Sequence, residues 1–426
     1  MGRLVDVRPD EKRALLWSFL CFFFLLGSYY VMRPLRDEMA IRAGVHSLHW
    51  IFTGTLATMV LAVPVWSALV ARFPVRRMIA FAYRFFIVNV LVFYVLLRMP
   101  GQHLGVARAF FVWNSVFNLF AVSIFWSLLA DIFDRAQGRR LFGFVSAGGS
   151  AGAIAGPLVA SLMVEVIGPD NLLPIAALLL EGAATSAGRL VAWARRHAPA
   201  RALTTKETAP ESDRLGGDAF AALLLLVRSP YLLAIAGYVL LMTSTGTMAY
   251  MLQSRLVAAS DLTSAGRTAL FARIDLAVSV GSALVQALVA GRLLSRFGTR
   301  LALLLSPLLT IASAVAMAAA PRLGVLIAGN IVRRITEYSI ARPAREVLFT
   351  TVSREEKYKP KALIDLVVYR GGDAASSWAF TAVEHLGAGI PVLSLSVLPL
   401  TLAWLAVTLW LGRREQPPTS SPDAPA

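Results

Sequence analysis

Long apolar stretches recur along the chain and are separated by short clusters of basic residues. Each stretch is close to the roughly 20 residues that an α-helix needs to cross the hydrocarbon core of a bilayer. Their length and lack of charge predict membrane-spanning helices. The stretches without any charged residue are 14–32, 51–71, 109–130, 141–164, 231–253, 301–320 and 390–411, and the stretch 78–97 differs only in carrying Arg84.

Four further stretches are apolar overall but contain ionisable residues. Only helices or closed barrels satisfy every backbone polar group in lipid, and the ten-residue alternation typical of barrel strands is absent from the sequence. We therefore expect an all-α integral membrane protein with about twelve transmembrane helices. The four stretches are 172–193 with Glu181 and Arg189, 270–290 with Arg273 and Asp275, 323–341 with Arg333, Arg334 and Glu337, and 361–383 with Asp365, Arg370 and Asp373.

The composition agrees with this pattern. Of the 426 residues, 57% are hydrophobic and 15% are charged, and the mean hydropathy is +0.66. Soluble domains are about 25% charged, so the composition argues against a soluble enzyme. In a soluble protein the net charge of +16 would suggest a nucleic-acid partner. Cytoplasmic loops of membrane proteins accumulate Lys and Arg, however, and we predict the lipid bilayer and no nucleic acid as partner.

Residues for catalysis or metal binding are not visible in the sequence. Cys21 is the only cysteine and the five histidines are scattered, so no disulfide framework, metal site or cofactor is predicted. Phosphate-binding loops and metalloprotease motifs are also missing, and no catalytic residue is predicted. The first apolar run is longer than a signal-peptide core and has no small-residue cleavage site after it, which predicts a first span instead.

A polar stretch at 194–228 carries several basic residues among Ser, Thr and Pro and predicts a cytoplasmic linker. It divides the chain into residues 1–193 and 229–414, each with six predicted spans, and a polar tail follows at 415–426. Basic residues concentrate in alternate connections, whereas the connection at 165–170 has none. Under the positive-inside rule this asymmetry predicts that the linker and both termini face the cytoplasm.

The two predicted halves share a short basic turn at the same place. Ala-Arg-Phe-Pro-Val-Arg occupies 71–76, after the second span, and Ser-Arg-Phe-Gly-Thr-Arg occupies 295–300, after the eighth. Two six-span halves are the layout of major facilitator transporters, whose substrates bind near the bilayer midplane between the halves. We expect a fold of this type.

Gly148, Gly152 and Gly156 recur every four residues in the fifth predicted span and share one helix face. Glycines on one face let a second helix approach closely. The pattern is consistent with simple close packing or with a helix interface that rocks during alternating access. Both interpretations predict that bulky substitutions are harmful.

The end of the first span carries the first candidate binding site. Arg33 and Arg36 share a face if the helix continues past Pro34, and Asp37 lies one turn beyond Arg33. Ionisable residues in spans are costly and mark either a pathway or a partner pair. Because arginine binds phosphate or carboxylate through a rigid fork of donors, the segment suggests an anion site. A solvated helix end with Arg33 paired to Asp37 is the alternative.

The eleventh predicted span carries the second candidate site. Its charges alternate at helical spacing and end at two glycines, which weaken a helix and allow close backbone approach. A stripe of this kind is not expected on a lipid-facing surface, although a structural salt-bridge seam would also explain it. The residues are Lys361, Asp365, Tyr369 and Asp373 on one stripe, with Arg370, Gly371 and Gly372 beside it.

Three segments of the chain resemble the ADP/ATP translocase family of plastids and intracellular bacteria, and more broadly its translocase-like bacterial relatives. They are 30–37, 120–126 and 361–365. The resemblance implies a twelve-span fold of the major facilitator type, a bacterial inner membrane location, and exchange or uptake of ATP and ADP. It places Arg36 and Lys361 at cationic positions of the family, and Asn114 and Ala249 at acidic ones.

We therefore predict a secondary transporter of an organic anion that works by alternating access, with a nucleotide as the most specific hypothesis. Two alternatives stay open: proton-coupled transport of another anionic or amphiphilic solute, and a membrane sensor or enzyme that does not transport. The candidate substrate-binding residues are Arg33, Arg36, Asp37, Asn114, Lys361, Asp365, Arg370 and Asp373.

Overall fold

The computed structural model describes residues 8–9, 11–72, 75–101, 103–197, 219–349 and 360–414. These residues are helical throughout apart from short turns, and no strand occurs among them, which confirms the predicted all-α class. Most of the predicted linker, residues 198–218, and the predicted tail at 415–426 lie outside the described ranges.

The first six helices follow the first six predicted spans but are longer than the uncharged stretches. They contain 24 to 33 residues each, and at 1.5 Å per residue even the shortest exceeds the roughly 30 Å of a hydrocarbon core. Helix α1 passes through Pro34 without ending, so the charged motif lies within the helix. The helices are α1 (Lys12–Arg42), α2 (Leu48–Arg72), α3 (Val75–Arg98), α4 (His103–Ile132), α5 (Arg135–Ile167) and α6 (Leu172–His197), with a short 3₁₀ turn η1 (Val45–Ser47) before α2.

The helices after the predicted linker are interrupted more often. The short helix α7 (Ala219–Arg228) precedes six helical segments that match the remaining predicted spans. Three single π-helical turns, which hold one extra residue per turn, continue directly into the helices around them. The elements are α8 (Pro230–Ala258), α9 (Ser264–Val285), η4 (Gln286–Ala290), α10 (Gly291–Ala319), α11 (Leu323–Thr336), η5 (Glu337–Ala341), α12 (Arg342–Leu348), η6 (Ile364–Val368), α14 (Tyr369–His385), α15 (Ile390–Leu395) and α16 (Leu398–Arg414).

Nine helices among the described residues are long and apolar enough to cross a membrane. One of them, Ser264–Ala319, has 56 residues and contains two predicted spans. The break between these two spans falls in the predicted basic turn, at Gly298, whose φ of 73° lies in the left-handed region that a residue with a Cβ rarely adopts. The predicted spans outside the nine are two of the four that contain ionisable residues, α11–α12 and η6–α14.

The chain forms two compact units, and two of the boundaries between them fall inside helices α8 and α9. The first unit holds Met1–Arg214 and Ser254–Val280, and the second holds Leu215–Gln253 and Gly281–Ala426. The segment from Ser254 to Val280 therefore belongs with the first six helices, although it follows the predicted linker. The predicted halves, 1–193 and 229–414, differ from the units by this segment.

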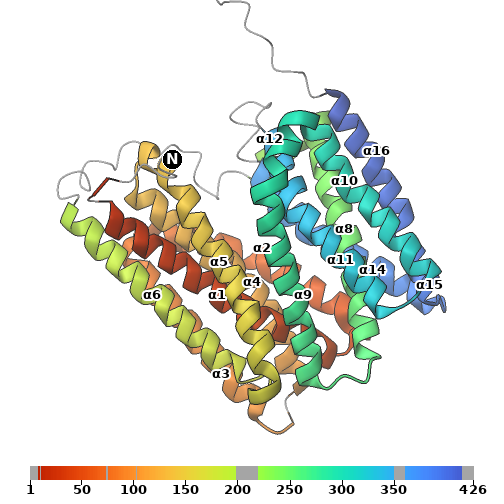
Figure 1. The fold of residues 1–426 in the computed structure, drawn as a ribbon, viewed down its shortest axis with the longest axis horizontal. Helices are drawn as coiled ribbons and strands as arrows, with labels where there is room; N and C mark the ends of the chain where they lie inside the picture. Colours follow the sequence, from red (N-terminus) through yellow and green to blue (C-terminus); the bar gives the residue numbers. More distant parts are fainter. Residues whose placement is uncertain are drawn as a thin grey trace, which may run out of the picture. The chain divides into compact units, whose positions relative to one another are not determined.

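Helix α1 is the centre of the first unit and packs against α4, α5 and α6, as the red and yellow helices of Figure 1 show. The glycines predicted to allow close approach face α1 from α5. A Cβ at Gly152 would lie 2.2 Å from the Phe23 carbonyl oxygen, and one at Gly156 would lie 2.7 Å from that of Gly27. Backbones this close leave no room for a side chain.

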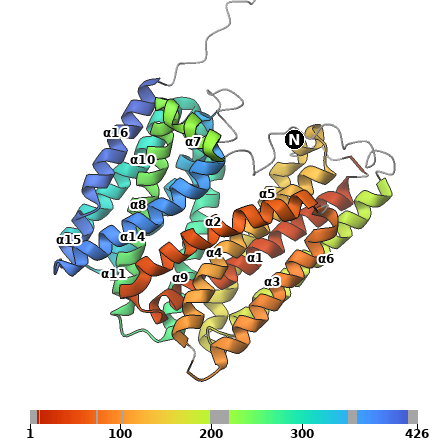
Figure 2. The same cartoon turned by 180° about the vertical axis from the view of Figure 1, so that it is seen from behind.

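The second unit has its hydrophobic core between α8, α10 and α16, which lie side by side in Figures 1 and 2. Tyr238 of α8 and Trp404 of α16 meet there edge to face, with ring centroids 5.5 Å apart. Both rings are buried. The α8 residues of this core lie between Leu232 and Met242, in the first half of the helix. The polar residues of α8 described below follow them along the helix.

Candidate functional site

Two arginines of the predicted motif lie on α1 and have acidic neighbours. Arg36 donates from Nε and Nη2 to Asp37 Oδ1 at 3.0 and 2.6 Å. Arg33 Nε lies 3.5 Å from Asp275 Oδ2 on α9. Both arginines are largely buried, and Asp275 is almost completely so. The predicted charges therefore lie inside the unit, as ionisable residues of spans usually do.

The α4 helix places one side chain against Arg36 and a second, polar one a turn further along. The Arg36 guanidinium carbon lies 4.8 Å from the centroid of the Phe111 ring, which is cation–π distance. Asn114 lies one turn further along α4, on the same face as Phe111. Its side chain is fully buried, and neither its amide oxygen nor its amide nitrogen hydrogen-bonds to any residue that the structure describes. A buried amide without partners is unfavourable, so this position needs an explanation.

Glu38 is the centre of a second set of contacts in the first unit. Arg267 of α9 donates to both of its carboxylate oxygens at 2.8 Å, and Arg42 Nε lies 3.5 Å from Oε1. Arg42 also contacts Asp170 at 3.5 Å and donates to Ser264 Oγ at 2.6 Å. Glu38 is fully buried. These contacts join the end of α1 to the start of α9.

In the second unit Asp373 of α14 is held by three donors. The hydroxyls of Thr243 and Thr247, on α8, donate to Oδ1 at 2.7 and 2.6 Å, and Arg370 donates to Oδ2 at 3.1 Å. Close approach of α14 to α8 depends on Gly372, where a Cβ would lie 2.3 Å from Thr243 Cγ2. A Cβ at Gly371 would meet nothing within 4 Å. The predicted close backbone approach is thus made by only one of the two glycines.

Lys361 and Asp365 pair with helix α12, whereas Asp373 contacts α8. Lys361 forms an ion pair with Glu346, and Asp365 lies 3.3 Å from Arg345. The expected single stripe therefore divides into two groups with different partners. The π-turn η6 contains Asp365 and adds one residue to the helix before Asp373. One extra residue rotates the following side chains by about 100°.

The α11 helix contributes polar residues that the sequence analysis did not place in a site. Arg333 has 8% of its surface exposed, and its Nη1 donates to Glu337 Oε2 at 3.2 Å. A Cβ at Gly246 of α8 would lie 3.2 Å from the same nitrogen, so the guanidinium packs on α8 where the side chain is missing. Asn330 donates to Gln253 of α8 at 2.7 Å.

The sequence signals for these additional residues differ. Arg333 and Glu337 are visible as charges within a predicted span. Thr243, Thr247 and Gln253 lie in an uncharged apolar stretch and give no such signal. Among the described residues, no group of three or more His, Cys, Asp or Glu side chains could hold a metal ion.

The fold is similar to that of solved transporter structures. A nucleoside transporter, NupG, matches with a TM-score of 0.63 and 15% identity over 95% of this chain and 99% of that chain. A POT family transporter in complex with a thioalcohol-conjugated peptide matches with a TM-score of 0.61 and 12% identity over 94% and 96%. The same family in complex with 5-aminolevulinic acid matches with a TM-score of 0.61 and 13% identity, again over 94% and 96%. At such identities the likeness concerns the fold.

Family membership follows from the sequence itself. No curated protein matches the chain. Residues 15–332, about three quarters of the chain, match the Major Facilitator Superfamily. Major facilitator proteins are secondary transporters built from two six-helix halves, in agreement with the helices described above. The chain therefore belongs to the Major Facilitator Superfamily, a group of multi-pass membrane transporters.

Proposed function

We propose that this transporter carries an organic anion and that Arg36 and Asn114 bind it. The observation that carries the proposal is the buried amide of Asn114, which has no hydrogen-bond partner among the described residues and lies one turn from the ring under Arg36. The amide offers a donor and an acceptor, and Arg36, which contacts Phe111 one turn away on α4, offers a cation. A bound anion with hydroxyl or amino groups would satisfy all three, which accounts for a group that otherwise only destabilises the protein.

The charges around Arg36 support an anionic substrate. Arg36 has a carboxylate neighbour in Asp37, and Arg33 has one in Asp275. A phosphate or carboxylate of the substrate competes with these acids for the same guanidinium groups, through the bidentate geometry that arginine favours. Binding would thus exchange one anion for another at each arginine and change the contacts between α1 and α9.

A nucleotide is the most specific substrate we propose, with ATP/ADP exchange as the mode of transport. Support comes from the resemblance of residues 30–37, 120–126 and 361–365 to the ADP/ATP translocase family, with Arg36 and Lys361 at its cationic positions. The matched structures include a nucleoside transporter and a POT family transporter bound to a peptide conjugate. The nucleotide that we propose differs from a nucleoside in its negative charge.

Proton-coupled transport of another anionic solute is the second candidate, and Asp373 favours it. Its carboxylate is buried between Thr243, Thr247 and Arg370. Carboxylates buried within membrane spans are common elements of proton relays in pumps and transporters. A pH gradient would drive uptake in this case, whereas nucleotide exchange would need only counter-substrate.

We also propose a bacterial inner membrane location, which the family resemblance implies. The arginine asymmetry between connections supports an orientation with both termini and residues 194–228 in the cytoplasm. A Thr205→Cys variant tests the orientation, because the single native cysteine, Cys21, is buried. An impermeant thiol reagent added to intact cells should leave position 205 unlabelled. Labelling comparable to that of opened cells would contradict the orientation.

The binding role of Arg36 is tested by uptake into proteoliposomes with a panel of labelled nucleotides. Arg36→Gln should raise the apparent KM at least tenfold, since an ion pair to a buried anion is lost. Arg98→Gln is the matched control, because Arg98 is exposed, stacks on Tyr94 and bonds Asn171 at the end of α3. Unchanged kinetics in Arg36→Gln at normal expression would remove Arg36 from the site.

A further inference from the structure

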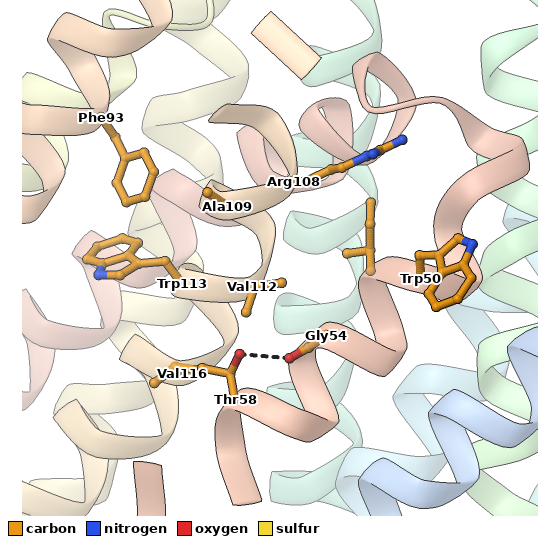
Figure 3. A pocket seen from close by; sticks show the side chains of 10 residues that line it. Trp50, Gly54, Thr58, Phe93, Arg108, Ala109, Val112, Trp113 and Val116 are labelled. Carbon is orange, nitrogen blue, oxygen red and sulfur yellow. Dashed lines mark hydrogen bonds between the residues drawn. The ribbon is translucent and has the colours of Figure 1, made fainter. Parts of the chain in front are cut away.

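An apolar groove lies between α2, α3 and α4 in the first unit, with a volume of about 520 Å³. Figure 3 shows Trp50 and Gly54 of α2, Phe93 of α3 and Trp113 of α4 around it. The one hydroxyl in its wall belongs to Thr58 and donates to the Gly54 carbonyl oxygen at 2.7 Å, so it is already satisfied within α2. The wall thus offers dispersion contacts and almost no hydrogen bonds.

A single cation, Arg108, is placed at one end of this groove (Figure 3). Arg108 is exposed, and its Nη2 donates to Ser47 Oγ at 3.1 Å and to the Ala43 carbonyl oxygen at 3.5 Å. Both acceptors are neutral. No carboxylate of the described residues forms an ion pair with Arg108, in contrast to Arg36, Arg42 and Arg267 in the same unit.

The groove runs along α2 and α4 in the direction expected for a lipid acyl chain that enters from the membrane surface. Trp50 lies near the start of α2 and Arg108 near the start of α4, and these two helices run parallel because α3 returns between them. Trp50 is 60% exposed, as expected for a tryptophan at the membrane–water interface. From Trp50 to Thr58, and from Arg108 to Val116, the groove follows eight residues, or about 12 Å of helix. It therefore extends from the interface into the hydrocarbon region.

We propose that this groove binds an anionic glycerophospholipid, with the headgroup phosphate on Arg108 and one acyl chain along α2 and α4. Arginine and an interfacial tryptophan suit a phosphate and its glycerol backbone, and the apolar wall suits the chain. A soluble anion would gain nothing from the wall, and an uncharged lipid would gain nothing from Arg108. The site is separate from the proposed substrate cluster, because Phe111 and Asn114 lie on another face of α4 than Ala109, Val112 and Trp113.

Native mass spectrometry of the purified full chain tests this site without measuring transport. The protein is incubated with phosphatidylglycerol and, separately, with a diacylglycerol of the same chains. Phosphatidylglycerol should bind more tightly to the unmodified chain. Arg108→Gln should weaken phosphatidylglycerol binding about fivefold, as one basic residue near an anionic lipid surface does, and should leave diacylglycerol unaffected. Ala109→Trp should reduce binding of both lipids, because it fills the groove.

Matched variants outside the groove keep the test specific. Arg98→Gln removes an exposed arginine at the end of α3, and Leu104→Trp adds a large ring at an exposed position of α4. Neither should change lipid binding. Equal binding of the two lipids, an Arg108→Gln variant that retains phosphatidylglycerol as tightly as Arg98→Gln does, or full binding by Ala109→Trp would each overturn the proposal.

Discussion

In the first unit two buried acids, Glu38 and Asp275, each pair with an arginine of another helix, whereas in the second unit the buried Asp373 takes its cation from its own helix. Glu38 and Asp275 join α1 to α9 through Arg267 and Arg33. Asp373 instead pairs with Arg370, three residues before it, and contacts α8 only through threonine hydroxyls. Ion pairs thus join α1 to α9, whereas hydrogen bonds from uncharged hydroxyls to a carboxylate join α8 to α14.

The difference has a consequence for transport. Separating two helices joined by a buried ion pair leaves an uncompensated charge, which is strongly unfavourable. Separating helices joined by hydroxyl hydrogen bonds costs far less, about 0.6 kcal/mol for each bond on average within membranes. The contacts between α1 and α9 are thus the ones that an incoming anion can change most, since it can supply the charge that a departing partner removes.

The largest expected effect is at Glu38. Glu38→Gln leaves Arg267 and Arg42 without their shared carboxylate, so thermal unfolding in detergent should show a loss of about 3–5 kcal/mol, as for other buried ion pairs that lose one partner. Glu165→Gln is the control. Glu165 of α5 likewise forms an ion pair with an arginine of α9, Arg273, but both side chains are more than half exposed. That variant should lose at most about 1 kcal/mol. Equal losses would contradict the special role of Glu38.

Gly372→Ala tests the close packing of α14 against α8. The new methyl group would overlap Thr243 and should cost about 1–3 kcal/mol, as in other overpacked interiors. Gly371→Ala is the adjacent control and should be neutral or slightly stabilising, because its methyl group meets nothing and alanine favours the helix. Calorimetry of the two variants gives the comparison, and a more harmful Gly371→Ala would show that α14 packs differently.

Asn114→Leu should raise stability while it lowers transport. Replacing a buried amide without partners by an apolar side chain of similar size removes a penalty of about 1–3 kcal/mol. The same change removes the proposed donor and acceptor for the substrate. Melting temperature and uptake, measured on the same preparation, should therefore move in opposite directions. A variant that loses stability and activity in proportion would assign Asn114 a structural role.

The smallest expected effect is at Thr247. Thr247→Val removes one of the three donors to Asp373 and keeps the shape, so the loss should be about 0.6 kcal/mol. The control is Thr310→Val, since the Thr310 hydroxyl donates to the Ser306 carbonyl oxygen of its own helix, α10. A loss above 3 kcal/mol in Thr247→Val would mean that hydroxyls hold α8 and α14 as firmly as charges hold α1 and α9.

The number of spans and the apolar centre of each were accessible from the sequence because a bilayer imposes one length on every span. The glycines at 148, 152 and 156 and Gly372 were accessible as well, since close backbone approach requires a missing side chain. The position of the helix ends was less so. Apolar stretches stop at the first charge, whereas α1 continues for ten residues beyond residue 32 with its charges inside the unit.

The partners of the charged residues were not accessible. Arg267 and Glu38 are 229 residues apart, and no local pattern joins them. The π-turn η6 changes which side chains share a face, so the helical spacing of Asp365 and Asp373 was misleading. Thr243 and Thr247 lie in an apolar stretch without charge. Asn114 entered the candidate site only through the resemblance to a family, because a single asparagine in an apolar span resembles any packed polar residue.

The charge of the substrate is the most direct test of the account. Proteoliposomes containing the full chain would be offered labelled ATP, ADP and other organic phosphates and carboxylates, and in parallel uncharged adenosine. The account predicts saturable uptake of at least one anion, competition among anions, and neither uptake of adenosine nor inhibition by it. Uptake of adenosine that no anion inhibits, with every anion excluded, would contradict the proposal that Arg36 and Asn114 form an anion site.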